Sequence, residues 1–215
     1  LKKRSEKQNA EKLSGCFSTL QTLVLASNNA GKVREFQAMF GELGIRIVPQ
    51  GELGVGSADE PFGTFLENAL AKARHAARET GLPAMADDSG ICADALGGHP
   101  GVHSARFAGG HDDAANNRLL VEKIRGAATR RAHYTCLLVA VRYPEDPEPL
   151  VAEGIWQGEI VDEPAGDGGF GYDPHFYVPE FGKTAAELTA EEKNRVSHRA
   201  RALAAMAELM RARWM

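Results

Sequence analysis

Two neighbouring carboxylates, Asp87 and Asp88, follow a short apolar stretch and precede Ser89-Gly90. Adjacent carboxylates repel each other, so a chain tolerates them when they stay hydrated, cap a helix or share a divalent cation. One interpretation of this tetrapeptide is an Asx turn. A second acidic pair, Asp59-Glu60, lies upstream in a glycine-containing loop and favours a Mg²⁺ site, because this ion takes one or two carboxylates together with phosphate oxygens and water.

A second candidate segment, Ser27-Asn28-Asn29-Ala30-Gly31-Lys32, joins a predicted strand to a predicted helix. Such a turn offers backbone N–H groups and the positive end of a helix dipole, and Lys32 adds a full charge, so the segment could hold a phosphate group. It is not a Walker A loop, because Ala26 replaces the first glycine and Val33 replaces the magnesium-binding hydroxyl. An asparagine-rich turn with a solvated lysine is the alternative.

A third candidate segment, Phe170-Gly171-Tyr172-Asp173, follows a glycine-rich stretch. Two aromatic rings and a carboxylate suit a planar base, since a ring can stack on it while the carboxylate accepts a ring N–H. The alternative is an aromatic pair that closes the core, with Asp173 starting a turn.

Basic residues gather near the start of the last predicted helix, at Lys193 and at Ser197-His198-Arg199. On one continuous helix, His198 and Lys193 would point in different directions. We therefore expect a break, with Ser197 as the N-cap of the final helix and Lys193 in the preceding turn. A capped, solvated, basic helix end is the alternative interpretation.

The elements that would position these segments alternate between strands and helices. Hydrophobic periodicity predicts helices at 64–80, at 112–125 and at the C-terminus, and a further helix carries Val33, Phe36 and Phe40. Predicted strands occupy 22–26, 45–48, 83–86, 133–143 and 150–160. This order predicts an α/β fold with a central mixed β-sheet flanked by helices, and it places the loops 27–32, 87–90 and 168–173 at strand ends.

Composition narrows the class of protein. The chain carries 25 basic and 29 acidic residues, a net charge of −4, which argues against a nucleic-acid partner. Its three cysteines form no CxxC pair, which indicates a reducing, cytoplasmic setting, and no apolar run is long enough to span a membrane. Residues 1–18 are predicted to be a flexible N-terminal extension, and residues 19–215 a single domain.

The segments above, taken with Leu96-Gly97-Gly98, Ser104-Ala105-Arg106 and Glu192-Lys193-Asn194, closely resemble the inosine/xanthosine triphosphate pyrophosphatases, and the bacterial branch above all. The resemblance runs in order from about Leu23 almost to the C-terminus. It departs from the family at two places. The family loop commonly opens Thr-Gly-Asn where this chain has Ser27-Asn28-Asn29, and the usual Glu-Glu pair is Asp59-Glu60 here.

The resemblance implies Mg²⁺-dependent hydrolysis of ITP, dITP and XTP to the monophosphate and pyrophosphate, by a homodimer whose subunits hold the active-site cleft between two lobes. It implies that Asp88 is the proton acceptor and a metal ligand, with Asp59 or Glu60 as a further ligand. The residues it assigns to the substrate are Ser27, Asn28, Asn29, Ala30, Gly31, Lys32, Ser89, Phe170, Gly171, Tyr172, Asp173, Lys193, His198 and Arg199. A non-catalytic nucleotide sensor that uses the same pocket is the alternative, and pyrophosphate release distinguishes the two.

Overall fold

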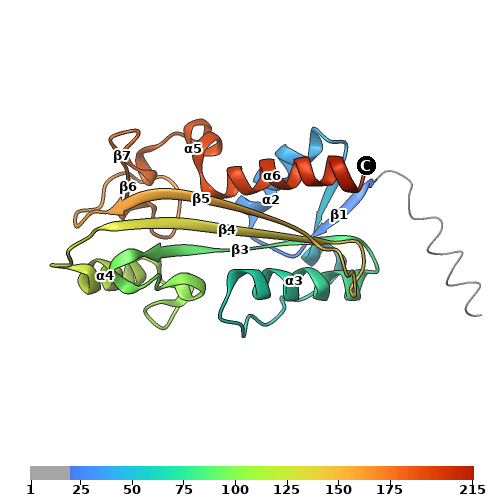
Figure 1. The fold of residues 1–215 in the computed structure, drawn as a ribbon, viewed down its shortest axis with the longest axis horizontal. Helices are drawn as coiled ribbons and strands as arrows, with labels where there is room; N and C mark the ends of the chain where they lie inside the picture. Colours follow the sequence, from blue (N-terminus) through green and yellow to red (C-terminus); the bar gives the residue numbers. More distant parts are fainter. Residues whose placement is uncertain (1–19) are drawn as a thin grey trace, which may run out of the picture.

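The computed structural model of the chain describes residues 20–215, and its centre is one seven-stranded mixed sheet (Figure 1). β1 runs parallel to β2 and to β3, and the remaining neighbours pair antiparallel. In sheet order the strands are β2 (Arg46–Pro49), β1 (Thr22–Leu25), β3 (Ala84–Ala93), β4 (Arg131–Val141), β5 (Leu150–Ile160), β6 (Phe176–Val178) and β7 (Lys183–Thr184). The predicted fold class is confirmed. The predicted extension at 1–18 lies outside the described residues.

Helices cover both faces of this sheet (Figure 1). α2 and α6 lie over one face, and α3 packs on β3 and β4 from the other. The helices are α2 (Ala30–Gly41), α3 (Phe65–Thr80), α4 (Asp113–Ile124), α5 (Ala190–Val196) and α6 (His198–Arg213), with short 3-10 turns that include η1 (Gln50–Leu53) and η3 (Gly101–Arg106). Within residues 20–215, no helix has the length and apolar character needed to cross a bilayer.

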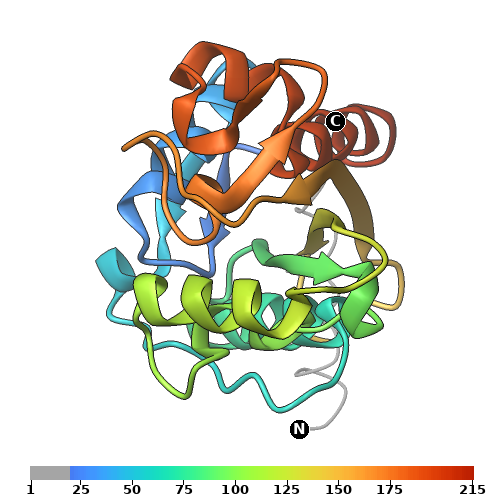
Figure 2. The ribbon, with the colours of Figure 1, turned by 90° about the vertical axis from the view of Figure 1, so that its left-hand side faces the viewer.

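The long strands β3, β4 and β5 connect two hydrophobic clusters. One cluster joins β1 and β2 to α2 and α6, with Phe36 and Met206 fully buried. The other joins α4 to β6 and to the far ends of β4 and β5, around Trp156. Figure 2 looks at this second end, where α4 lies below the strands and the segment with β6, β7 and α5 lies above them. This arrangement agrees with the two lobes implied by the resemblance.

The prediction that a strand ends just before Asp87 is wrong. β3 continues to Ala93, and Asp87 pairs with Leu138 of β4 while Asp88 pairs with Leu137. Acidic residues are typical of turns, but here the backbone is fixed by ten consecutive cross-strand pairs with β4. Successive side chains of a strand point to opposite faces, so the sheet separates the two carboxylates.

The predicted break before the last helix is confirmed. Ser197 is the N-cap of α6, and its Oγ accepts a hydrogen bond from the Ala200 N–H at 3.2 Å. Lys193 lies on the short helix α5 rather than in a turn, because Thr189 and Glu192 form a capping box that starts this helix.

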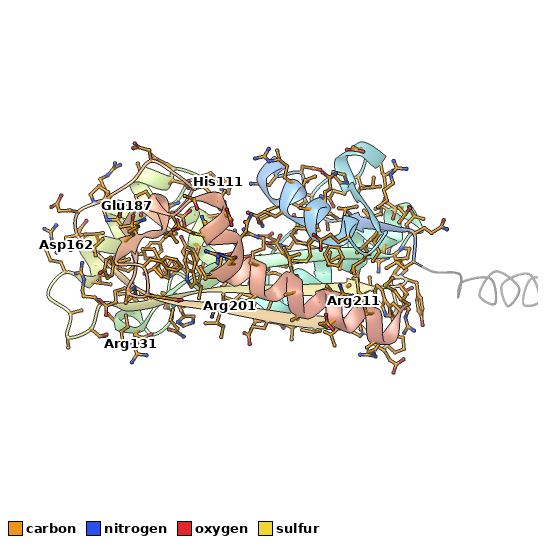
Figure 3. All side chains as sticks on the ribbon, turned by 90° about the horizontal axis from the view of Figure 1, so that it is seen from above. His111, Arg131, Asp162, Glu187, Arg201 and Arg211 are labelled. Carbon is orange, nitrogen blue, oxygen red and sulfur yellow. The ribbon has the colours of Figure 1, made fainter. Side chains whose placement is uncertain are left out.

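α6 packs closely against β5 because a glycine faces it. A Cβ atom added to Gly154 would lie 2.0 Å from the carbonyl oxygen of His198 and 2.6 Å from the amide nitrogen of Ala202. About one turn after His198 on α6, the guanidinium of Arg201 donates a hydrogen bond to the carbonyl oxygen of Ile155 at 2.7 Å; Arg201 is labelled in Figure 3. The position of α6, and of the active-site candidates at its start, therefore depends on Gly154.

We predict that Gly154→Ala lowers the free energy of unfolding by about 1–3 kcal/mol, because the added methyl group meets backbone atoms that cannot rotate away. Chemical denaturation measures this change. Gly41→Ala is the matched control, since no atom outside its own helix lies within 4 Å of the added Cβ. An unfolding midpoint for Gly154→Ala as high as that of Gly41→Ala would contradict this account of the packing.

Candidate active site

Asp87 lies on the face of β3 that α2 and α6 cover. Its carboxylate is 2% exposed and forms an ion pair with Lys32 Nζ at 2.8 Å. Arg199 Nε lies 3.6 Å from Asp87 Oδ2, and the Ser89 hydroxyl donates to the same oxygen at 2.8 Å. Lys32 comes from the first turn of α2 and Arg199 from the first turn of α6. One buried carboxylate thus joins the starts of two helices.

The charges around Asp87 fix its protonation state. Burial alone would raise the pKa of this carboxyl, but Lys32 and Arg199 outweigh it and hold the pKa far below its ordinary value. Burial would likewise lower the pKa of Arg199, and Asp87 reverses that effect. Asp87 therefore remains ionised and acts as the counter-ion that two cations share.

Asp88 points to the opposite face, which α3 covers. Lys72 Nζ of α3 lies 2.9 Å from Asp88 Oδ1 and 2.8 Å from Glu60 Oε1, and Asn68 Nδ2 lies 3.3 Å from Asp88 Oδ2. Burial raises the pKa of Asp88, although Lys72 opposes the effect. A carboxylate with a raised pKa is suited to accept a proton near neutral pH.

Sequence analysis did not identify Lys72 or Asn68. The two residues stand four apart, so they share one face of α3, and the residues next to them, Ala69 and Ala73, are fully buried. The sequence does carry one signal for these two residues, which is a lysine and an asparagine on the alanine-rich face of a predicted helix. A polar side chain at such a position needs a buried partner. The identity of that partner, Asp88, depends on a contact between elements.

Glu60 and Asp88 converge on one cation, whereas Asp59 does not take part. Asp59 is exposed, and no ion pair or side-chain hydrogen bond connects it to another described residue. No cluster of three or more His, Cys, Asp or Glu side chains suited to a metal occurs within residues 20–215. The two carboxylates that share Lys72 nevertheless fit Mg²⁺, which takes one or two protein carboxylates and completes its octahedron with phosphate and water.

The predicted phosphate-binding turn forms the N-terminus of α2. Asn29 is the N-cap, and its Oδ1 accepts from the N–H groups of Gly31 and Lys32 at 2.9 and 3.1 Å. Asn28 Oδ1 accepts from the Gly51 N–H of η1 at 2.8 Å, which gives the side chain at the family's glycine position a structural contact. The N–H groups of Gly31 and Lys32 are thus already engaged, while the side chains of Ser27 and Lys32 are among those that line a small polar cavity.

That cavity, which we call the polar pocket, has a volume of about 160 Å³. Its lining includes Ser27, Asn28, Lys32, Glu60, Lys72 and Asp87. A larger cavity of about 260 Å³, which we call the aromatic pocket, brings together Ser89, Phe170, Tyr172, Asp173, Lys193, His198 and Arg199. Lys32 lines both pockets, so they adjoin. Candidate segments from four distant parts of the chain meet here.

In the aromatic pocket, charged residues surround an exposed ring. Phe170 is 52% exposed, and Lys193 Nζ and the Arg199 guanidinium lie 5.3 and 5.9 Å from its centroid. Asp173 Oδ2 accepts from Lys193 Nζ at 2.5 Å and from the Phe170 N–H at 2.9 Å. Lys193 and Asp173 therefore stand as a cationic donor and an anionic acceptor side by side.

His198 and Arg199 are buried at the inner end of this pocket. The imidazole of His198 stacks on Tyr134 with ring centroids 4.7 Å apart, and burial together with the charge of Arg199 lowers its pKa well below the ordinary value. Its Nδ1 is buried without a hydrogen-bond partner among the described residues. Arg199 also contacts Glu35 Oε2 at 3.2 Å. Arg199 is thus held between two carboxylates, while His198 is a neutral ring.

Comparison with known proteins identifies the family. Residues 23–209 match the model of the Ham1 family. The chain belongs to the Ham1 family. It is 64% identical over 197 residues to a dITP/XTP pyrophosphatase of Bordetella pertussis, covering 90% of this chain and 92% of that protein. It is also 64% identical over 191 residues to a dITP/XTP pyrophosphatase of Chromobacterium violaceum, covering 88% of this chain and 97% of the relative.

Solved structures support the same assignment. A HAM1 protein from Coxiella burnetii has a TM-score of 0.86 and 44% sequence identity, covering 89% of this chain and 98% of that chain. The Ham1 protein of Staphylococcus aureus has a TM-score of 0.82 and 37% identity, again over 89% and 98%. The family resemblance inferred from the motifs is therefore confirmed.

The Asp87 ion pairs predict how stability depends on pH. Because the folded-state pKa lies below the unfolded value of about 3.9, the stabilisation is complete above that pH and is lost as the pH falls toward the folded pKa. We expect Asp87→Asn to lower the free energy of unfolding at pH 7 by about 2–4 kcal/mol, because two cations lose their shared counter-ion.

Urea denaturation between pH 7 and pH 3 measures this difference. The gap between wild type and Asp87→Asn should narrow below about pH 4, by about 1.4 kcal/mol per pH unit. Asp167→Asn serves as the control, since this exposed carboxylate forms no ion pair within the described part of the chain. If the difference in free energy of unfolding between wild type and Asp87→Asn stays constant down to pH 3, Asp87 is not the carboxylate that makes stability depend on pH.

Proposed function

We propose that the chain hydrolyses non-standard purine nucleoside triphosphates, namely dITP, ITP and XTP, to the monophosphate and pyrophosphate. The observation that carries this proposal is the 64% identity, over 90% of this chain, to a relative named dITP/XTP pyrophosphatase. Two adjoining pockets support it, one polar and one aromatic, with Lys32 between them. Such an activity removes abnormal purines before they enter DNA or RNA.

The two pockets suggest how the substrate lies. The base enters the aromatic pocket beside Phe170, and the triphosphate extends past Lys32 into the polar pocket. Ser27 and the start of α2 then face the phosphates, where the helix dipole and the lysine charge stabilise anions. In this orientation, the site formed by Asp88, Lys72 and Glu60 lies next to the phosphates.

In the proposed reaction, Asp88 accepts a proton from a water molecule as the water oxygen bonds to the α-phosphorus. The bond from that phosphorus to the oxygen bridging toward the β-phosphorus breaks, and pyrophosphate leaves with the bonding electrons. Burial raises the pKa of Asp88, which favours this proton transfer, and Lys32 stabilises the growing negative charge.

We also propose that the activity requires Mg²⁺, held by Asp88 and Glu60. When bound, the ion neutralises phosphate charge and polarises the scissile bond. Lys72 Nζ contacts both of these carboxylates in the structure, so Lys72 would have to give up these ion pairs for Asp88 and Glu60 to hold the ion. Asp59, which is exposed, has no part in this site.

Selectivity against adenine follows from hydrogen-bond polarity. Hypoxanthine and xanthine present an O6 acceptor and an N1–H donor, which match the cationic donor Lys193 and the acceptor Asp173. Adenine presents the opposite pattern, an amino donor and an N1 acceptor. Bound adenine would leave two polar groups of the pocket unpaired. We therefore expect kcat/KM for dITP, ITP and XTP to exceed that for ATP by a factor on the order of a thousand.

The motif resemblance and the cysteine pattern carry one further proposal each. We propose that the protein acts as a homodimer and that it works in the cytoplasm. Analytical ultracentrifugation of the purified chain tests the first proposal, with a mass near twice 23.1 kDa as the expected result. Fractionation of cells that produce the protein tests the second.

The test of function is pyrophosphate release from dITP, ITP, XTP, GTP and ATP, each with Mg²⁺ and with EDTA. We expect rapid release from the first three with Mg²⁺, little from ATP, and none with EDTA. Binding of dITP without any pyrophosphate release would instead support a nucleotide sensor. Hydrolysis of ATP as fast as dITP would contradict the proposed base recognition.

Three variants test the assignment of the carboxylates. Asp88→Asn should lower kcat by about 10³-fold or more while the protein remains folded, because the substitution is nearly isosteric. Glu60→Gln should raise the Mg²⁺ concentration needed for half-maximal activity. Asp59→Asn, its neighbour in sequence, should leave that concentration unchanged. If Asp59→Asn and Glu60→Gln behave alike, the proposal that Glu60 rather than Asp59 holds the metal is wrong.

A further inference from the structure

The segment that would hold the base is packed unevenly, since Tyr172 and Asp173 are buried whereas Phe170 is exposed. Phe170 is 52% exposed, and Gly171 has a φ of +62°, in the left-handed region that favours glycine. The orientation of the Phe170 ring and of Asp173 therefore depends on how the backbone between them is held. Contacts from other elements supply this restraint.

Helix α4 binds both polar groups of Gly171. The Gly171 N–H donates to Asp113 Oδ2 at 2.7 Å, and its carbonyl oxygen accepts from Asn117 Nδ2 at 2.7 Å. Asn117 Nδ2 also donates to the carbonyl oxygen of Asp113 at 2.8 Å. We call Asp113 and Asn117 the Gly171 clamp. Because the two residues lie four apart on one helix, they reach the same glycine.

The orientation of the Asn117 amide is set by its surroundings. The residue is 6% exposed, and its two N–H groups face two carbonyl oxygens, so a flipped amide would place oxygen against oxygen. Its Oδ1 is buried without a partner among residues 20–215. A buried acceptor left unpaired is unfavourable, and the two hydrogen bonds that Asn117 donates offset this cost.

The preceding residue, Asn116, holds another segment that lines the aromatic pocket. Asn116, 1% exposed, accepts from the Ala108 N–H at 2.7 Å and donates to the carbonyl oxygen of Ala105 at 3.2 Å. Ala105 lines the aromatic pocket, as do Asp113 and Gly171. The first turns of α4 thus contact two separate walls of one cavity.

We propose that Asp113 and Asn117 are positioning residues for base recognition, acting through Gly171 on Phe170 and Asp173. The inference rests on the proposed function, because it assigns the aromatic pocket to the base. Loss of the clamp frees the backbone at Gly171, so the ring and the carboxylate no longer meet the base together. Neither residue reaches the polar pocket, so binding of the phosphates is unaffected.

The test compares variants at both positions. Asn117→Leu and Asp113→Leu remove the hydrogen bonds, whereas Asp113→Asn keeps an acceptor oxygen for the Gly171 N–H. Asp112→Ala is the matched control, since Asp112 caps α4 through the Ala115 N–H and has no contact with residues 170–173. Any effect of a loosened helix end appears in this control as well.

For the leucine variants we expect KM for dITP to rise about tenfold, and the ratio of kcat/KM for dITP over ATP to fall by a similar factor, as the loss of a hydrogen bond to Gly171 implies. The change in kcat should stay within about threefold, because the reacting atoms are untouched. Asp113→Asn and Asp112→Ala should stay within about twofold of wild type in KM.

Calorimetry supplies a readout that does not require turnover. The Kd of inosine monophosphate should rise about tenfold in the leucine variants, while the Kd of pyrophosphate stays unchanged.

If wild type binds inosine monophosphate but hydrolyses no dITP, the proposed function fails and these affinities still test the clamp. If Asn117→Leu does not fold, Asp113→Leu decides, since Asp113 is exposed. Unchanged KM and Kd values, or equal losses in Asp112→Ala, would overturn the inference.

Discussion

The structure depends on two adjacent carboxylates buried in the middle of one strand. Asp87 and Asp88 are 2% and 8% exposed, and alternation along β3 sends them to opposite faces of the sheet. A buried charge requires a partner, so each face must supply a cation. Lys32 of α2 and Arg199 of α6 serve one face, and Lys72 of α3 serves the other. The helices on both sides are thus fixed relative to β3 by charge as well as by apolar packing.

This division gives the carboxylates different chemistry. Asp87 has a depressed pKa and connects Lys32, at the junction of the two pockets, to Arg199 beside Phe170. Asp88 has a raised pKa and shares the cation Lys72 with the partly exposed Glu60. We propose that the first carboxylate organises the two ends of the substrate site and that the second serves in proton transfer and metal binding.

Local sequence signals predicted the features that short segments determine. The turn before α2, the N-cap at Ser197 and the hairpin of β4 and β5 each depend on neighbouring residues, and all of them occur. The continuation of β3 through Asp87 and Asp88 was not predictable from propensity, because pairing with β4 overrides it. Lys72 was missed because its partner lies on another element. The roles of the site residues stay predictions, since geometry alone brings them together without showing turnover.

We propose that the base and phosphate ends of the substrate place the α-phosphorus beside Asp88, where water attacks it. Hydrolysis of dITP in ¹⁸O-labelled water, followed by mass spectrometry of both products, tests this claim directly. We predict that one labelled oxygen appears in deoxyinosine monophosphate and none in pyrophosphate. Label in pyrophosphate would show attack on the β-phosphorus, and labelled orthophosphate would show attack on the γ-phosphorus. Either result would contradict the account.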